Sequence, residues 1–227
     1  VAIRLNNLAE LYRDQGRLKK AIPLYNEAIA IDETALGRTH PNVATYLNNL
    51  AGVYKALGEW DRAEEKYKRA MEIDSKALNE NHPDISIYLN NLAGLYKAQG
   101  RYEEAEPLYL RALEARERTL GAEHPSTLAT VGNLAVLYQS QGRYEEAEPL
   151  YLRSLEAQER TLGAEYPKTL MTVGNLAGLY ESQGRYEEAA PLYLRALEAQ
   201  ERTLGEEHPS TLASVHNLAG LYGSQGR

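Results

Sequence analysis

Cysteine and phenylalanine are absent from the 227 residues of this chain, and only two methionines and one tryptophan occur. Without cysteine, neither disulfides nor thiolate metal sites can form, so a reducing, cytoplasmic compartment is the expected location. No apolar run approaches the roughly 20 residues that a membrane-spanning helix needs, and no basic and apolar leader opens the sequence. We therefore expect a soluble protein without a membrane partner.

The chain also has few basic residues relative to acidic ones. It contains 25 Lys and Arg and 32 Asp and Glu, which gives a net charge of −7. Nucleic-acid-binding proteins obtain much of their affinity from Lys and Arg that neutralise phosphates. The seventeen tyrosines are expected to fill core positions and interleave no basic patch. The sequence therefore argues against a nucleic-acid partner.

Catalytic signatures are missing as well. The sequence has no P-loop, no GxSxG and no HExxH motif. Four histidines recur in the same sequence context, far apart along the chain, and are too dispersed to form one metal or proton-transfer site: His40, His82, His124 and His208. We expect no enzymatic activity, no cofactor and no metal, and we interpret these histidines as structural connectors.

A repeat of 42 residues is what the sequence does contain. One asparagine recurs in every copy, as Asn7, Asn49, Asn91, Asn133, Asn175 and Asn217. A period of this length is the signature of an array of stacked supersecondary units. The 227 residues hold about five repeats and one additional helix.

Each repeat contains two amphipathic helical patterns. The first has an apolar stripe at i, i+3, i+4 and i+7 and stops at a glycine, as in Leu47, Leu50, Ala51, Tyr54 and Gly58. The second has a similar stripe, with Ala105, Leu108, Tyr109, Ala112 and Leu113, and runs to Leu120 before Gly121. Gly or Asn occupies the position of Gly121 in each repeat, and these residues tolerate the left-handed backbone of a helix C′ position.

Prolines mark the helix starts. Five of them follow short connectors and are expected at the first position of each next first helix: Pro41, Pro83, Pro125, Pro167 and Pro209. Four others lie early in the second helices, where we expect a slight bend and no break: Pro23, Pro107, Pro149 and Pro191. The predicted organisation is a single all-α array over 1–227: a leading repeat with helices in 1–15 and 16–37, units 41–79, 83–121, 125–163 and 167–205, and a truncated final repeat, 209–227.

The residues Leu47, Leu50, Ala51, Tyr54, Gly58, Ala63, Tyr67 and Ala70 follow the small and large signature of the tetratricopeptide repeat. With its 42-residue period and its TLGxEHP, LNNLAxLY and QGRYEEAEPLYxRALE segments, the chain resembles the repeat domain of kinesin light chains. It is equally similar to the repeat arrays of bacterial and fungal NLR-like signalling ATPases. The resemblance implies an α-solenoid, a right-handed superhelix of stacked helix-turn-helix repeats whose first helices line a concave groove.

The face of the first helix opposite the apolar stripe is small and nearly uncharged, with Thr45, Asn49, Gly52 and Ala56. Glycine inside a helix costs about 1 kcal/mol relative to alanine, so close approach of a neighbouring helix or a ligand must justify Gly52 and its equivalents. The repeated asparagines offer amide donors and acceptors that match an extended peptide backbone. We predict that this asparagine ladder binds a peptide; the alternative is that each asparagine only orders the stack.

Neighbouring columns are expected to select the side chains of that peptide. One column reads Asn6, Asn48, Asn90, Gly132, Gly174 and His216, and another reads Arg13, Lys55, Lys97, Gln139, Glu181 and Gly223. The first half of the groove is thus basic and rich in amides, which favours acidic side chains or a terminal carboxylate. The alternative is that these cations are solvated residues at helix ends.

The predicted function is a non-enzymatic scaffold that captures a protein or peptide in its groove, as cargo adaptors do. The alternative is a sensor or assembly region of a larger NLR-like signalling ATPase. Because the sequence begins at Val1 and stops within a repeat, we expect a piece of a longer protein. Self-association through an apolar face around Leu218, Ala219 and Tyr222 of the last helix is a third expectation.

Overall fold

The computed structural model describes residues 1–78 and 83–224, and this part of the chain is all-helical, without a strand. Its helices are α1 (Ala2–Asp14), α2 (Leu18–Leu36), α3 (Pro41–Ala56), α4 (Trp60–Leu78), α5 (Pro83–Ala98), α6 (Tyr102–Leu120), α7 (Pro125–Ser140), α8 (Tyr144–Leu162), α9 (Pro167–Ser182), α10 (Tyr186–Leu204) and α11 (Pro209–Ser224). Odd-numbered helices are the first helices of the repeats, and even-numbered helices are the second. Asn79, Asn81, His82, Gly226 and Arg227 lie outside the described residues.

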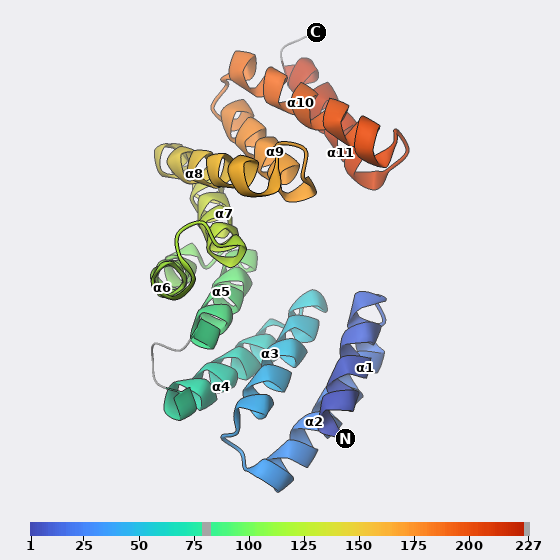
Figure 1. The fold of residues 1–227 in the computed structure, drawn as a ribbon, viewed down its shortest axis with the longest axis vertical. Helices are drawn as coiled ribbons and strands as arrows, with labels where there is room; N and C mark the ends of the chain where they lie inside the picture. The colour runs from blue at the N-terminus through green and yellow to red at the C-terminus, as the bar shows by residue number, and fades with distance from the viewer. Residues whose placement is uncertain (79–82, 225–227) are drawn as a thin grey trace. The chain divides into compact units, whose positions relative to one another are not determined.

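The contacts divide the chain into two compact units, Val1–Thr119 and Leu120–Arg227. Within the first unit, successive helices from α1 to α5 pack against one another, and the first helices α1, α3 and α5 also touch in succession. In the second unit, successive helices from α7 to α11 likewise pack against one another, and α7 also touches α9 (Figure 1). Stacked helix pairs confirm the predicted α-solenoid architecture.

A tight glycine turn ends the first helices. Gly58 has a φ of 74°; its N–H donates to the Lys55 carbonyl at 3.1 Å, while the Glu59 N–H donates to the Tyr54 carbonyl at 2.9 Å. These two bonds form a Schellman motif, which satisfies carbonyls that the helix leaves open. The equivalent bonds recur at Gly16, Gly100, Gly142 and Gly184, so the predicted stops are confirmed.

The second helices also end where the sequence predicts, but with a different backbone. Gly163 has φ 97° and ψ 156°, a combination outside the left-handed helical region and restricted to glycine. Gly37 and Gly205 share it. The expected left-handed helical conformation is therefore wrong at these three turns, because the chain leaves the helix in an extended direction toward the next proline.

The prolines begin the first helices as predicted, and the histidine before them has a definite task. The Nδ1 atom of His124 accepts a hydrogen bond from the Ser126 N–H at 3.1 Å, which caps the start of α7. His40 and His208 accept equivalent bonds from Asn42 and Ser210. Tyr166 takes the same place before α9 and makes no such bond. The prolines early in the second helices leave those helices unbroken, as at Pro23 in α2.

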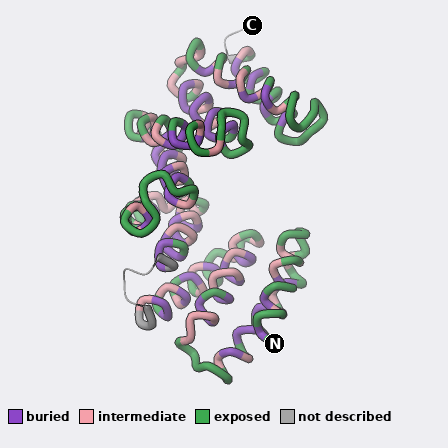
Figure 2. Tube along the Cα trace, viewed as in Figure 1, coloured by how far each residue is buried: buried purple, intermediate pink, exposed green. Residues whose placement is uncertain are grey.

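The core lies between the first and second helices and is wider than the predicted stripe. Leu47, Leu50, Ala51 and Tyr54 are buried, and so is Val53, which the i, i+3, i+4 pattern leaves out. Helix α3, for example, contacts the second helices α2 and α4 and the first helices α1 and α5, so most of its surface is covered (Figure 2). In the first unit, Ile85 and Leu89 pack with Ala112 of α6 and with the partly buried Leu108 and Met71.

Arginines join consecutive repeats by stacking on tyrosines. The Arg101 guanidinium lies 4.0 Å from the centre of the Tyr96 ring and donates to Glu64 of the preceding repeat at 2.7 Å. The Tyr96 hydroxyl donates to the same carboxylate at 2.9 Å. Arg185, Tyr180 and Glu148 repeat this arrangement in the second unit. Glutamates pair with Arg101 and Arg185, so each arginine that stacks on a tyrosine has a counter-ion.

Across the described residues, no helix combines the length and apolar composition that crossing a membrane requires.

Candidate functional site

The small-residue face of the first helices is where the predicted site residues lie. Some glycines of this face are explained by tyrosines of the second helices, whose hydroxyl groups lie close to them. A Cβ added at Gly94 would lie 3.4 Å from the Tyr109 hydroxyl and 3.0 Å from Lys55 Nζ. A Cβ at Gly178 would lie 3.4 Å from the Tyr193 hydroxyl. Close approach of a neighbouring helix, one of the two reasons expected from the sequence, therefore applies at these positions.

In the first unit, the repeated asparagines bond to the preceding repeat. The Nδ2 atom of Asn49 donates to Asn6 Oδ1 at 3.0 Å and to the Glu10 carboxylate at 2.9 Å. The Nδ2 atom of Asn91 donates to Asn48 Oδ1 at 2.8 Å. These half-buried amides connect α3 with α1 and α5 with α3, so here the asparagines order the stack.

The second unit has lost the acceptors of these bonds. Gly132 and Gly174 stand where the first unit has Asn48 and Asn90, and a Cβ at either glycine would meet no atom within 4 Å. Asn175 and Asn217 accordingly have no side-chain hydrogen bond within the part of the chain that the structure describes. Their amides remain available to a ligand.

A hollow of about 500 Å³ surrounds these amides. We call it the amide hollow; it is lined by Val136, Gln139, Ser140, Tyr151, Gly174, Asn175, Gly178, Ser182, Tyr193 and Asn217. These residues come from every helix between α7 and α11. The lining is mostly small and polar, which leaves room for a polypeptide backbone and offers it hydrogen bonds.

Two tyrosine hydroxyls in the amide hollow are already paired. Tyr151 donates to the Gln139 side chain at 2.8 Å, and Tyr193 donates to the Glu181 carboxylate at 2.8 Å. Burial, together with the Glu181 hydrogen bond, raises the pKa of Tyr193, so its hydroxyl stays protonated at neutral pH. The Asn175 and Asn217 amides, by contrast, have no hydrogen-bond partner among the described residues.

The basic residues predicted in the groove, Arg13, Lys55 and Lys97, differ in their burial and in their ion pairs. Arg13 forms an ion pair with Asp14 at 3.0 Å, at the end of α1. Lys55 and Lys97 are half-buried near the ends of α3 and α5 and make no ion pair or hydrogen bond with the described residues. Burial lowers the pKa of each, and the charge of Lys97 lowers the pKa of Lys55 further. The two lysines are thus unlike the solvated helix-end cations of the alternative interpretation.

The remaining predicted residues lie on the same faces of their helices. Asn7 is exposed on α1 and accepts a bond from Asn6 Nδ2 at 3.3 Å. Asn90 and Asn133 are half-buried on α5 and α7, and His216 is exposed on α11. On the last helix, Leu218 is buried, Tyr222 is half-buried and Ala219 is exposed, while Leu212 and Val215 expose 55% and 44% of their surface.

Sequence reasoning missed the tyrosine hydroxyls. It assigned Tyr109 and Tyr151 to the core, which is correct for their rings, but the hydroxyls end at the small-residue face. The available signal was a constant separation of twelve residues between each such tyrosine and the column of Lys97, Gln139 and Glu181. Within the described residues, no group of three His, Asp or Glu side chains is placed to hold a metal ion.

The chain matches the sequence profile of a known repeat family over most of its length. The sequence profile of the tetratricopeptide repeat matches residues 1–76, 48–118, 84–160, 127–199 and 168–227. None of the curated protein sequences compared with the chain matches it.

Solved structures give the same result. Two crystal structures of a Podosopora anserina protein assigned as a kinesin light chain with nearly identical TPR-like repeats, one of them of a point variant, align with TM-scores of 0.76 and 0.75. They are 30% and 31% identical to this chain and cover 88% of it, with 94% and 95% of their own chains aligned. BtubC (BKLC) from P. vanneervenii, at 23% identity and a TM-score of 0.77, covers 92% of this chain with 84% of its own and shares the fold.

Proposed function

The chain belongs to the tetratricopeptide repeat family, and we propose that it is a non-enzymatic scaffold whose small-residue face binds an extended segment of a partner protein. Repeats of this family generally mediate protein–protein interactions. The likeness to a Podosopora anserina protein assigned as a kinesin light chain supports an adaptor role.

The observation that carries the proposal is the pair of unpartnered amides in the amide hollow. Asn175 and Asn217 stand one repeat apart on neighbouring first helices and line the same hollow. Each amide can donate to a peptide carbonyl and accept from a peptide N–H, irrespective of the peptide's side chains. A ladder of this kind binds a backbone in general, and neighbouring residues then select among sequences.

The asparagines have separate tasks in this proposal. Asn49 and Asn91, whose amides are used between repeats, contribute to stability, whereas Asn175 and Asn217 contribute to binding. Asn133 is the equivalent asparagine on α7, the first helix of the second unit.

The test is a selection of random twelve-residue peptides against the 227-residue chain, followed by affinity measurements on the peptides obtained. The double substitution Asn175→Ala/Asn217→Ala is expected to weaken the binding of these peptides about tenfold or more, because each lost hydrogen bond contributes about 1 kcal/mol. Its unfolding midpoint is expected to match that of the wild-type chain.

Asn49→Ala is the matched control. It removes bonds to Asn6 and Glu10, so it is expected to lower the free energy of unfolding by about 1–3 kcal/mol and to leave peptide affinity in the second unit unchanged. Peptides that compete with one another yet bind the double variant as tightly as the wild type would contradict the asparagine ladder.

We further propose that α11 supports self-association, because Leu212 and Val215 are exposed on this helix. Exposed apolar side chains that cluster on one helix are typical of interaction surfaces.

A further inference from the structure

The second helices of the second unit expose leucines on a side that does not belong to the small-residue face. Leu152 on α8 and Leu194 on α10 occupy the same place in their repeats and expose 44% and 38% of their surface. Pro149 and Pro191, about one turn earlier on the same side, are exposed as well. Exposed apolar side chains that recur at one position of neighbouring helices are typical of a contact surface.

Two ion pairs hold α8 and α10 next to each other. Just before the start of α10, Arg185 binds the Glu148 carboxylate of α8 at 2.7 Å. Further along α10, Arg195 binds the Glu159 carboxylate of α8 at 2.5 Å. Glu159 lies about two helical turns after Leu152, on the same side of α8. The exposed sides of the two helices therefore keep a fixed relation to each other.

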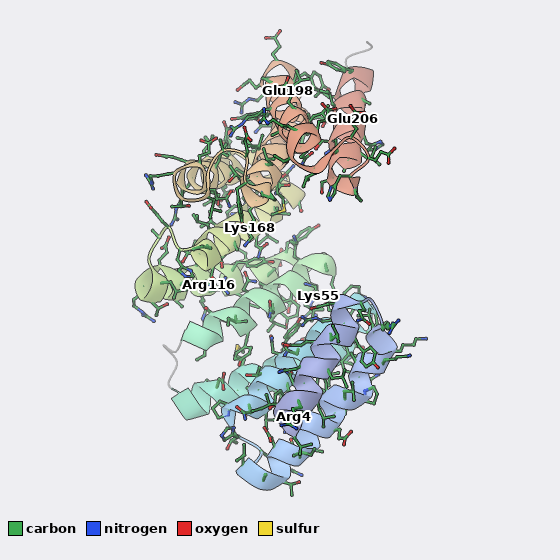
Figure 3. The ribbon with its side chains drawn as sticks, turned by 45° about the vertical axis from the view of Figure 1, so that its right-hand side comes forward. Arg4, Lys55, Arg116, Lys168, Glu198 and Glu206 are labelled. Carbon is green, nitrogen blue, oxygen red and sulfur yellow. The ribbon has the colours of Figure 1, made fainter. Side chains whose placement is uncertain are left out.

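Unpaired carboxylates lie on both sides of these leucines along each helix. Each leucine has one exposed glutamate seven residues before it and another four residues after it, on the same side of its helix: Glu145, Glu156, Glu187 and Glu198. None of the four forms an ion pair or a hydrogen bond with the described residues. Figure 3 shows Glu198 on α10. We call the two leucines and these four glutamates the outer leucine surface; it is apolar in the middle and acidic toward both ends.

Helix formation does not explain the leucines. In the first unit, the same place is occupied by Asn26 on α2, Lys68 on α4 and Leu110 on α6. Lys68 pairs with Glu64 of its own helix at 2.6 Å. Helices α2 and α4 have the same nineteen-residue length as α8 and α10. A second helix therefore forms equally well with a polar residue at this place, so the fold does not require leucine there.

The charge of the outer leucine surface decides which partner fits it. Residues 120–227 contain fourteen acidic residues and eight basic ones, so this unit repels polyanions such as nucleic acid and anionic lipid. A second copy of the chain would bring the same four glutamates against them, which is also repulsive. A segment that carries Lys or Arg on both sides of apolar residues is complementary, because its cations pair with the carboxylates while the leucines are removed from water.

The spacing of the glutamates indicates the shape of that segment. Glu145 and Glu156 are eleven residues apart, which corresponds to about 16 Å along the axis of α8. A partner helix lying along α8 and α10 has basic residues at the same separation on one side when they too are eleven residues, or about three turns, apart. Apolar residues at i, i+3, i+4 and i+7 between them form the stripe that meets the leucines.

We propose that the outer leucine surface of α8 and α10 binds a basic amphipathic helix of a partner protein. The apolar stripe of that helix contacts Leu152 and Leu194, and its Lys or Arg residues pair with the four glutamates. This surface lies on the second helices and shares no residue with the amide hollow. It therefore adds a second binding surface to the extended-segment site of the proposed function and does not depend on it.

Three sixteen-residue, fluorescein-labelled peptides with amidated C-termini test the apolar and the charged part of the proposal. The first has Leu at i, i+3, i+4 and i+7 in an alanine background, with two Lys at each end. The second has Ser in place of Leu, and the third has Glu in place of Lys. Binding to the 227-residue chain is measured by fluorescence anisotropy at physiological salt, which screens non-specific attraction. We expect the first peptide to bind at least tenfold more tightly than either of the others.

The variant Leu152→Asn/Leu194→Asn copies the residue that α2 carries at this place, so it is expected to fold with an unchanged unfolding midpoint. It keeps the charge of the surface and removes the apolar contact, and it should weaken the first peptide at least tenfold. Met171→Asn is the matched control, because Met171 is an exposed apolar residue on the first helix α9; it should leave the affinity unchanged.

Replacing all four glutamates of the outer leucine surface by Gln tests the charged part. This variant should weaken the first peptide severalfold and reduce the dependence of its affinity on salt, because the cations lose their partners. Asn175→Ala/Asn217→Ala, which tests the amide hollow, should leave the affinity for the first peptide unchanged. The two binding proposals can therefore fail separately.

Three results would overturn the proposal: no detectable binding of the first peptide, equal binding of its Ser counterpart, or unchanged affinity in Leu152→Asn/Leu194→Asn. Light scattering on the same variant tests the competing occupant. If the variant no longer associates at concentrations where the wild-type chain does, the surface is covered by a second copy of the chain and the proposed partner helix is refuted.

Discussion

At the scale of single residues, the clearest electrostatic feature is the carboxylate of Glu64. Partial burial acts to raise its pKa, but hydrogen bonds from Arg101, Lys68 and Tyr96 outweigh this and lower the pKa to about 2. Three donors from two consecutive repeats thus meet on one anion. We therefore expect the contact between α4 and the following repeat to be strongest when Glu64 is ionised.

Stability of the first unit is therefore expected to fall in acid. Since the pKa of Glu64 is lower in the folded chain than its usual value near 4.3, its contribution is fully present above pH 5 and is lost as the pH falls from about 4.5 toward 2. Urea unfolding at pH 7, 4 and 3 should show a smaller decline for Glu64→Gln than for the wild type. The difference should be about 1 kcal/mol or less, because solvent screens partly exposed pairs. Parallel declines would mean that this carboxylate has no such role.

Helix capping provides a second prediction at this scale. Tyr166 is the one residue before α7, α9 or α3 that makes no side-chain cap, whereas His124 and His40 cap their helices through Nδ1. Tyr166→His is expected to raise the free energy of unfolding by about 0.5–1 kcal/mol, within the range of N-cap effects. As the matched control, His124→Ala removes the cap of α7 and is expected to lower the free energy of unfolding. The measurement is the urea midpoint of each variant. A destabilised Tyr166→His chain would show that the exposed tyrosine ring contributes more than the cap.

At the scale of elements, the first helices combine two kinds of glycine. Those such as Gly94 and Gly178 are tied to a tyrosine hydroxyl from the second helix, whereas Gly132 and Gly174 have no neighbour that a methyl group would meet. Packing explains the first kind. The second kind costs helix stability without a packing reason.

Gly174→Ala is accordingly expected to stabilise the chain by about 1 kcal/mol, the helix-propensity difference between the two residues. Because Gly174 lines the amide hollow, the same substitution should weaken peptides that bind there. Gly163→Ala is the control of opposite sign, since φ 97° and ψ 156° exclude a side chain, and it should destabilise by about 1–3 kcal/mol. Thermal unfolding and peptide affinity are measured on each variant. Unchanged peptide affinity in Gly174→Ala would show that Gly174 is not part of the peptide-binding surface.

The helices themselves could be predicted from the sequence, and their exposed faces only in part. Period, proline and glycine define where each helix begins and ends, because these are local effects of backbone geometry. Whether Asn49 or Asn175 has a hydrogen-bond partner is not a local property, because it depends on which residue the preceding repeat presents across the stack. The same asparagine is bonded at 49 and free at 175 because a position 43 residues earlier holds Asn in one case and Gly in the other.

At the scale of the whole molecule, exposed apolar surface on α11 bears on the state of the chain in solution. Leu212 and Val215 expose about half of their surface there, although Leu218 and Leu221 on the same helix are buried. Of the residues expected from the sequence to form this surface, Leu218 packs inward, whereas Ala219 is exposed and Tyr222 is half-buried.

We expect the 227-residue chain to associate in a concentration-dependent manner, and Leu212→Lys/Val215→Lys to abolish it by placing charge on that surface. Light scattering over a hundredfold range of concentration is the measurement. Met171→Lys, at a comparably exposed residue on α9, is the control and should leave association unchanged. A strictly monomeric wild-type chain would refute the proposal.

The difference between repeats with asparagine and those with Gly132 or Gly174 at the same position also bears on how such arrays can come to bind new ligands. In an array whose repeats bond to one another through amides, a binding group does not have to be added. Removing an amide from one repeat leaves the amide of the next repeat without its acceptor, so under the proposed function a single substitution turns a stacking contact into a binding group. Under the proposed function, repeats of this kind can therefore gain binding groups by losing single hydrogen bonds between repeats, while their helices stay the same.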